Sequence, residues 1–461
     1  MNIRESSYGY WSSTRAFIWV AGGAAMGIGG VARLPYLAAQ YGGSVFWVVY
    51  VLALLLLAWP LLVAELMVGR WTRDDVVAGF EWLTQGGGAP RVWRWLGVLA
   101  LACAALILSY YCVVAGWYMA YTLRGASGLV NGLTADQASG LFFELAQDPE
   151  RSLAWHTIFM ATACLIVAHG ARDGIERCAS YLAPAGLGIA VLVLVLSLFD
   201  PHAPAALVRL FDFRPAEFGW RGFLEALYQA FYTLGLGLGV MIAYGSYLPS
   251  QTSLPRVALG VIGVDTIFSV LVGTALFVLL DRPGDGLAQG SITQVFLQLP
   301  QDLSPGFGGH ILALLFYLML LMVTLVSAIA LLEPPTRYLM DRYRVPRVFA
   351  AAYGAMVIWY LGLVTLLSFN VIRDWRWFGQ NPFEWLQWIT SRLLVPASVL
   401  LLCTFIVRVL PVDIARAGWG ERDRALFQPW RHLLRYPVRL SLLVVLLMST
   451  GVIDWLVKLW S

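Results

Sequence analysis

Charged residues are scarce in this sequence. Only 13% of its 461 residues are charged, while 59% are hydrophobic. An ordinary soluble domain carries roughly 25% charged residues, and a water-soluble chain of this length could not bury so much apolar surface. The composition therefore excludes a soluble globular protein and indicates an integral membrane protein.

Cysteine and histidine are also few. The five cysteines lie in or beside apolar runs, and their spacing fits neither a disulfide framework nor a metal motif. The five histidines are scattered and form no ligand pair. A membrane-embedded enzyme would need His, Asp or Cys clustered within its spans, and an ion channel would show pore repeats or charged rings. The sequence shows neither pattern.

Apolar runs of about 20 residues recur along the chain, which is the length that a helix needs to cross a hydrocarbon core of about 30 Å. Continuous runs predict helices, because a membrane β-barrel would show short alternating segments instead. We place eleven transmembrane helices at residues 15–36, 42–67, 92–122, 154–170, 180–199, 222–246, 257–280, 308–333, 347–370, 385–409 and 437–459.

Arginines cluster in alternate loops between these spans. The clusters at 70–94, 172–177, 337–347 and 408–431 all fall on the same side as Arg4. The positive-inside rule makes that side cytoplasmic. We therefore expect a multi-pass protein of the cell membrane, the inner membrane of a bacterium, with its N-terminus in the cytoplasm.

Two spans are unusually rich in glycine, at residues 21–30 and 233–239. Each glycine costs about 1 kcal/mol in a helix relative to alanine, so such clusters favour an unwound segment. Close packing between helices is the alternative explanation. These are the first and sixth spans, so each opens one half of a five-plus-five arrangement. Interrupted helices in matching places predict a midplane binding site, where freed amides hold a carboxylate and freed carbonyls hold a cation.

Ordered motifs along the chain resemble those of the neurotransmitter:sodium symporter family. They are Trp-Ser-Ser at 11–13, Gly-Ile-Gly-Gly-Val-Ala-Arg-Leu-Pro-Tyr at 27–36, and the segments 42–43, 60–70, 110–111, 174–177, 229–234 and 244–247. The resemblance covers nearly the whole chain. It implies an all-α integral membrane protein with the fold of the bacterial leucine transporter, a five-plus-five inverted repeat with one additional helix. A single membrane domain would fill residues 1–461, with repeats at about 11–199 and 220–409 and the extra helix at about 437–459.

The resemblance implies a secondary active symporter that imports a neutral amino acid, apolar or aromatic, and not an enzyme. Monoamine carriers of the family have an Asp where this chain has Gly27, so a substrate with its own carboxylate fits better. Tyr111 resembles the tyrosine that caps the substrate carboxylate, and Tyr232 resembles the aromatic lid. The residues expected to bind substrate are Ala24, Ala25, Gly27, Ile28, Gly29, Ile107, Tyr111, Tyr232, Thr233, Gly235, Leu238, Ser327 and Leu331.

Three charged residues resemble the gates of the family. Arg33 matches the arginine of the outer gate, and Glu384, which opens the tenth span, is its expected acidic partner. Asp341, after the eighth span, resembles the acid of the inner gate. For Arg33 the alternative is a side chain that merely snorkels to the membrane interface.

The sodium sites depart from the family pattern. Gly30 stands where the family has a ligating Asn, and Val326 stands where it has Thr or Asp. Sodium remains the expected ion, with no organic cofactor, but a proton-coupled transporter and a transport-dead amino acid sensor of the same fold stay open. The candidate sodium ligands, counting main-chain carbonyls, are Gly23, Ala25, Met26, Thr233, Asp265, Val323 and Ser327.

Asp265 replaces a second ligating Asn and is the one acid in an apolar span of about 24 residues. A carboxylate at the centre of a membrane helix costs roughly 2.5–3.5 kcal/mol, so it needs a partner or a function. It could ligate sodium, carry a proton, act structurally, or stand in for chloride, because Tyr50, Gln229, Thr233 and Ser269 resemble the family's chloride site. We expect chloride-independent transport. The expected partners are a small amino acid and the lipid bilayer, with no nucleic acid; monomer and homodimer both stay open.

Overall fold

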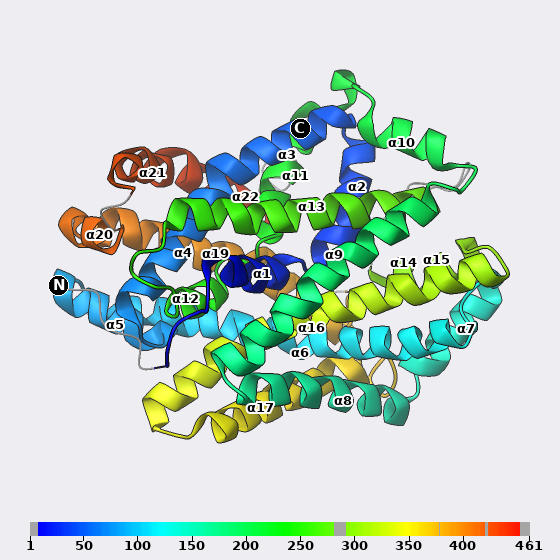
Figure 1. The fold of residues 1–461 in the computed structure, drawn as a ribbon, viewed down its shortest axis with the longest axis horizontal. Coiled ribbons are helices and arrows are strands. Elements are labelled where there is room, and N and C mark those ends of the chain that lie inside the picture. The colour runs from blue at the N-terminus through cyan, green and yellow to red at the C-terminus, as the bar shows by residue number, and fades with distance from the viewer. Residues whose placement is uncertain (1–7, 281–291, 378, 420–422, 452–461) are drawn as a thin grey trace.

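The computed structural model describes residues 8–280, 292–377, 379–419 and 423–451, with the backbone alone at 28–32, 292–293 and 307. Helices run through nearly all of these ranges (Figure 1). Within them the only strand-like pairing is two isolated bridges, Gly43 with Phe213 and Trp377 with Gln380. The predicted all-α class is confirmed.

The first half of the chain forms α1 (Thr14–Ala25), α2 (Ile28–Gln40), α3 (Ser44–Ala53), α4 (Trp59–Thr72), α5 (Val76–Gly87), α6 (Arg94–Ala126), α7 (Ala135–Ala146), α8 (Pro149–Ala168), α9 (Arg177–Ser197) and α10 (Ala203–Phe211). The second half forms α11 (Gly219–Tyr232), α12 (Val240–Gly245), α13 (Leu254–Leu280), α14 (Ile292–Leu297), α15 (Leu299–Asp302), α16 (Phe307–Tyr343), α17 (Arg347–Leu367), α18 (Pro382–Trp388), α19 (Val395–Thr404), α20 (Val412–Trp419), α21 (Phe427–Leu433) and α22 (Arg439–Ser449). Short π-helical turns join α3 to α4, α18 to α19 and α21 to α22.

Nine helical segments within the described ranges are long and apolar enough to cross a membrane. They match the predicted second to fifth and seventh to eleventh spans; the last runs over Arg424–Ser449, earlier than predicted, and the end of the predicted helix lies outside the described residues. The first and sixth predicted spans are not among the nine, because each is divided into two shorter helices. Nine continuous and two broken spans agree with the predicted architecture.

The two breaks have different local causes. Between α1 and α2 the chain is extended at Gly27, with φ −82° and ψ 157°. Between α11 and α12 three glycines, Gly235, Gly237 and Gly239, have φ of 59°, 82° and 72°. Side chains with a Cβ rarely adopt such angles, so glycine is what allows the sixth span to unwind here. Both predicted interruptions are confirmed.

Glycines of the first span also serve close packing. A Cβ on Gly22 would lie 2.7 Å from Val264 of α13, and one on Gly23 would lie 2.8 Å from Ala183 of α9. Figure 1 shows α1 near the centre of the molecule, with α13, α9 and α16 around it. Both explanations of the glycine clusters therefore hold, at different residues.

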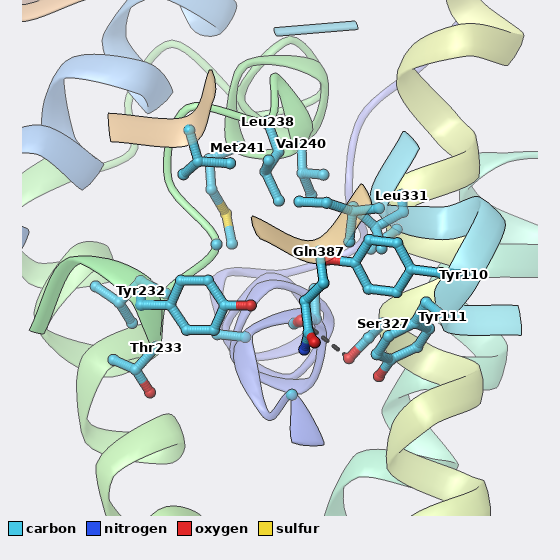
Figure 2. Close-up of a pocket in the computed structure, with 18 of the residues that line it drawn as sticks. Tyr110, Tyr111, Tyr232, Thr233, Leu238, Val240, Met241, Ser327, Leu331 and Gln387 are labelled. Atoms are coloured by element: carbon cyan, nitrogen blue, oxygen red, sulfur yellow. Dashed lines mark hydrogen bonds between the residues drawn. The ribbon is translucent and has the colours of Figure 1, made fainter. Parts of the chain in front are cut away.

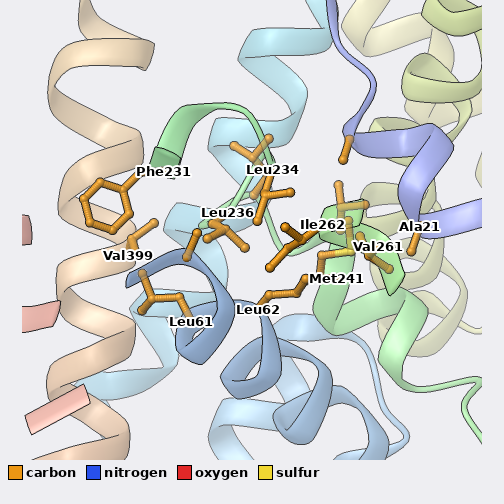
Figure 3. Close-up of a cluster of buried hydrophobic side chains, with 14 of the residues drawn as sticks. Ala21, Leu61, Leu62, Phe231, Leu234, Leu236, Met241, Val261, Ile262 and Val399 are labelled. Carbon is orange, nitrogen blue, oxygen red and sulfur yellow. The ribbon is translucent and has the colours of Figure 1, made fainter. Parts of the chain in front are cut away.

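The unwound segment of the sixth span rests on apolar side chains. Leu234 and Leu236 are buried there, and Figure 3 shows them among Leu61 and Leu62 of α4, Ile262 of α13 and their neighbours. Burial of a leucine side chain is worth roughly 1.5–3 kcal/mol. This anchoring holds a segment that lacks helical hydrogen bonds in one place, next to the break in the first span.

Candidate functional site

A cavity of about 140 Å³ lies where the two broken helices approach each other. Its walls come from both breaks and from α6, α16, α18 and α19 (Figure 2). The predicted substrate residues that line it are Ala24, Ala25, Gly27, Ile107, Tyr111, Tyr232, Thr233, Gly235, Leu238, Ser327 and Leu331. The other two predicted residues, Ile28 and Gly29, form the start of α2. Only their backbone is described, so their contact with the cavity is not assigned.

The structure adds residues to this lining that the sequence did not suggest: Tyr110, Val114, Leu234, Val240, Met241, Ala330, Gln387 and Val395. Gln387 is the polar one from a new helix, α18, and Figure 2 shows its amide on the side of the cavity where Ser327 and Tyr111 lie. The signal for Gln387 in the sequence is a polar residue in an apolar span, one turn after Glu384 on the same helix. That signal does not say which face of the helix meets the cavity.

Polar groups at the breaks face the cavity. The Ser327 hydroxyl donates to the Ala24 carbonyl at 3.1 Å and so ties α16 to the first break. The Tyr111 hydroxyl is buried and has no hydrogen-bond partner among the described residues. No side chain caps the start of α2 at Gly27, so the first amides of that helix are available to an anion. This arrangement can bind a carboxylate.

Asp265 of α13 is completely buried beside this cavity. One of its carboxylate oxygens accepts a hydrogen bond from the Thr233 hydroxyl at 2.9 Å, and Thr233 lines the cavity. Its other oxygen has no partner among the described residues, and the same holds for the Tyr50 hydroxyl and both atoms of the Gln229 amide. Buried polar atoms without partners cost about 1–3 kcal/mol each. Their concentration here points to a place where an ion or polar ligand binds.

The residues that resemble the family's chloride site lie near Asp265 or on the same helices as Asp265 and Thr233. Tyr50 of α3 lies close enough to Asp265 for the two groups to interact electrostatically. Gln229 lies one turn before Thr233 on α11, and Ser269 lies one turn after Asp265 on α13. A helix brings residues four apart to the same face.

The other candidate sodium ligands lie where α1 meets α16. A Cβ on Gly23 would lie 2.9 Å from Val326, so the two backbones approach closely there. Met26 follows the last turn of α1, and Val323 packs near Gly186 of α9. The oxygens available here are main-chain carbonyls and the Ser327 hydroxyl, because the side chain of Val326 has no oxygen.

The predicted outer-gate pair is not formed in this structure. Arg33 instead pairs with Glu225 of α11, with 2.6 Å between Nη2 and Oε2. Glu384 caps its own helix, because its carboxylate accepts from the Asn381 amide at 2.8 Å. Glu225 is 192 residues from Arg33 in the chain, and only the apposition of the two broken helices brings them together.

Asp341, near the end of α16, belongs to a cluster of charged residues. It accepts a hydrogen bond from the Tyr8 hydroxyl at 2.6 Å and one from Arg337 at 3.3 Å. Nearby, the buried Glu333 pairs with Arg347 at 2.5 Å and accepts from a tyrosine, Tyr247, at 2.5 Å. Burial and the Asp341 carboxylate raise the pKa of Tyr8 to about 12, so its hydroxyl stays protonated and can donate.

Glu65 of α4 braces the unwound sixth span. It is completely buried, and its Oε1 accepts a hydrogen bond from the Gly237 amide at 2.6 Å. The Ser398 hydroxyl donates to the carbonyl of the same glycine at 2.7 Å. Both backbone groups of a residue outside any helix are thereby satisfied, which a buried unwound segment requires.

Nine membrane-length helices within the described residues, together with two broken spans around a central cavity, form the arrangement of a secondary transporter. Residues 8–131 and 158–414 match the sequence model of the sodium:neurotransmitter symporter family. The chain belongs to this family of sodium-dependent symporters and is a membrane transporter, not an enzyme.

Relatives support this assignment over the full length. The sodium-dependent transporter YhdH of Bacillus subtilis is 30% identical over 459 residues, which cover 96% of this chain and 98% of that protein. A sodium-dependent transporter of Haemophilus influenzae is 26% identical, over 94% and 96% of the two chains. The crystal structure of MhsT in complex with L-phenylalanine superimposes with a TM-score of 0.85 at 31% identity and covers 96% of this chain and 99% of that one. The predicted leucine-transporter fold is confirmed.

Proposed function

We propose that this protein imports a neutral amino acid, apolar or aromatic, across the cell membrane together with sodium and without chloride. The observation that carries the proposal is the position of Asp265. Its carboxylate bonds to Thr233, a residue that also lines the central cavity. A buried carboxyl group therefore lies directly behind the candidate substrate site, and when ionised it places a fixed negative charge there.

The cavity suits a zwitterion with an apolar side chain. Its walls include Ile107, Leu238 and Leu331, and its described lining contains no acidic or basic side chain. An amine without a carboxylate would find no charged partner there, whereas a carboxylate can bind the amides at the start of α2 and the Tyr111 hydroxyl. The related MhsT binds phenylalanine, which fits this chemistry.

The same residue supports coupling to a cation without chloride. Asp265 and Thr233 supply oxygens to a cation, and the helix breaks supply main-chain carbonyls. Two like charges about 4 Å apart repel by roughly 4 kcal/mol at an effective dielectric near 20. That repulsion would cut the occupancy of a chloride beside an ionised Asp265 by about a thousandfold.

Proteoliposomes that take up labelled phenylalanine test the proposal. We expect uptake to persist when gluconate replaces chloride and to collapse when choline replaces sodium at constant pH. Asp265→Asn should abolish uptake or make it respond to chloride. Asp374→Asn, at an acid that is 95% exposed, is the matched control and should behave as wild type. Wild-type uptake that requires chloride would refute the proposal.

A proton-coupled transporter is the second candidate, and one observation favours it. The Oδ1 atom of Asp265 has no partner among the described residues, so this carboxyl group can hold a proton. Uptake driven by an inward proton gradient in sodium-free liposomes would establish this alternative in place of sodium coupling.

A further inference from the structure

A second and larger cavity, of about 370 Å³, lies between α6, α17 and α18, apart from the substrate cavity. Its lining and that of the substrate cavity have no residue in common. The two cavities nevertheless lie against different faces of the same two helices, α6 and α18. Leu106 and Leu386 line the second cavity, while Ile107 and Gln387, the next residues along the chain, line the first.

The second cavity is apolar and opens toward the side of the helix bundle. On α17 its lining residue Val364 is 46% exposed, although the helix is of membrane length. The one hydroxyl in its described lining, that of Ser109, already donates to the Leu106 carbonyl at 2.7 Å. Water needs two to four polar partners to occupy a cavity. Gln380 brings the one amide side chain to the described lining, and the Trp385 indole N–H is already used. So few polar groups cannot hold water throughout the space, which therefore suits hydrocarbon.

The size of the cavity matches one lipid chain. The volume of about 370 Å³ is well above the roughly 150 Å³ of an apolar protein cavity that binds benzene, so the recess can hold a substantial part of an acyl chain. The inner wall reaches the fully buried Ser109. A recess of this depth suits a flexible chain better than the flat face of a helix from a second protein copy.

Three tryptophans line this cavity, and two arginines lie close to one of them in the chain. Trp375 and Trp377 pack edge to face with their ring centroids 5.1 Å apart, and the Trp385 indole donates to the Trp377 carbonyl at 2.7 Å. Tryptophan is enriched at the level of lipid head groups. Arg373 and Arg376 are close to Trp375 in the chain, and both are exposed. Arg373 lies 3.9 Å from the Asp374 carboxylate, and Arg376 donates one hydrogen bond to the Gly379 carbonyl at 3.2 Å, so each retains guanidinium donors for a ligand. Guanidinium groups bind phosphate through charge-assisted hydrogen bonds.

We propose that this cavity is a lipid site, which holds one acyl chain of an anionic glycerophospholipid with its phosphate near Arg373 and Arg376. The lipid would support α18 from behind, on the side opposite to the face that presents Gln387 to the substrate cavity. This inference does not depend on the identity of the transported amino acid or of the coupled ion.

The test uses the full-length protein and two probes with identical acyl chains, phosphatidylglycerol and phosphatidylcholine. Native mass spectrometry counts the lipids that remain bound after release from detergent. We expect one phosphatidylglycerol on the wild type, and a loss of about tenfold or more in Val364→Trp, because the indole fills space that the chain would occupy. Leu361→Trp, which fills the same recess from the preceding turn of α17, should act alike.

Val357→Trp is the matched control, since Val357 is 57% exposed on α17 but does not line the cavity. It should retain the lipid as the wild type does. The double variant Arg373→Gln/Arg376→Gln should lose the preference for phosphatidylglycerol over phosphatidylcholine. A cooperative thermal transition at the wild-type temperature confirms that each variant is folded. Equal retention by Val364→Trp and Val357→Trp, equal retention of the two lipids by the wild type, or a second protein copy released by Val364→Trp would each overturn the proposal.

Discussion

Arg33 of α2 and Glu225 of α11 form an ion pair that joins the two broken helices. The Arg33 guanidinium also lies 4.9 Å from the centre of the Tyr228 ring. Tyr228 in turn stacks on Tyr232, with their ring centroids 5.7 Å apart, and Tyr232 lines the substrate cavity. A continuous series of contacts therefore runs from this ion pair to Tyr232 in the wall of the cavity.

We expect Arg33→Ala and Glu225→Gln to slow transport far more than they reduce expression. The two side chains are 34% and 17% exposed, so water screens the pair and its loss should cost about 1 kcal/mol, or roughly fivefold in uptake rate. Initial uptake rates, normalised to the amount of protein in the membrane, measure this effect.

Glu384→Gln is the control for this pair, because glutamine preserves the capping box with Asn381 and removes only the charge. It should transport as the wild type does. If Glu384→Gln slows uptake as much as Glu225→Gln, then Glu384 is a gate residue after all and the pair with Glu225 is not decisive.

The sequence predicts features that depend on local pattern. Apolar run length gives the spans, and the clusters at 21–30 and 233–239 give the breaks, because glycine acts on its own backbone. Asp265 was recognisable as an isolated acid in an apolar helix. Partners across the bundle were not recognisable: Glu225, Gln387 and the Glu333–Arg347 pair depend on how helices are placed, and no local pattern records that placement.

The stability of the protein should depend on the ionisation of Asp75, which caps α5. Its carboxylate accepts hydrogen bonds from the Val77 and Ala78 amides at 2.9 and 3.2 Å. Burial and, to a lesser extent, the nearby Asp341 and Asp74 raise the pKa of Asp75 to about 6, against the hydrogen bonds from Ala78 and Val77, which lower it. Between the ordinary value near 4 and pH 6 the folded protein therefore binds more protons than the unfolded chain. Stability should fall as the pH rises through this window and should level off above it.

Asp75→Asn tests this effect, since asparagine also caps helices but carries no charge. At pH 7.5 the variant should be more stable than the wild type by up to roughly 3 kcal/mol, the equivalent of about two pKa units. The gain should shrink as the pH falls toward 4. Thermal melts of both proteins at pH 4.5–7.5 measure the difference, and a difference that is constant with pH would contradict the assignment.

The Tyr8 hydroxyl should hold the N-terminal segment against Asp341. It donates at 2.6 Å, and the Arg337 guanidinium lies 4.3 Å from the centre of the same ring. Tyr8→Phe keeps the ring and removes the hydrogen bond, which should cost about 1 kcal/mol at this partly exposed position. The Trp11 amide, bonded to the Tyr247 carbonyl at 3.1 Å, should then exchange its hydrogen about fivefold faster. Tyr181→Phe, at an exposed tyrosine, is the control. If the Trp11 amide exchanges equally fast in both variants, the Tyr8–Asp341 hydrogen bond does not hold the N-terminal segment.

Gly235 and Gly237 offer a matched pair in the unwound segment of the sixth span. Both have positive φ, of 59° and 82°, so alanine at either position costs roughly 1–2 kcal/mol in backbone strain. Their surroundings differ. A Cβ on Gly237 would lie 2.6 Å from a Val399 methyl carbon, whereas a Cβ on Gly235 would meet only Leu238, at 3.5 Å.

We therefore expect Gly237→Ala to lower the melting temperature more than Gly235→Ala, because it adds a clash to the same strain and disturbs the amide that bonds to Glu65. Gly235→Ala should remain folded and change selectivity instead. Gly235 and Leu238 both line the cavity, so an added methyl group reduces the space for a substrate side chain. A missing or added methylene in such a pocket is worth about 1–3 kcal/mol. Stabilisation by phenylalanine should consequently weaken in Gly235→Ala while stabilisation by alanine is retained. An equal loss for both amino acids would place Gly235 away from the substrate side chain.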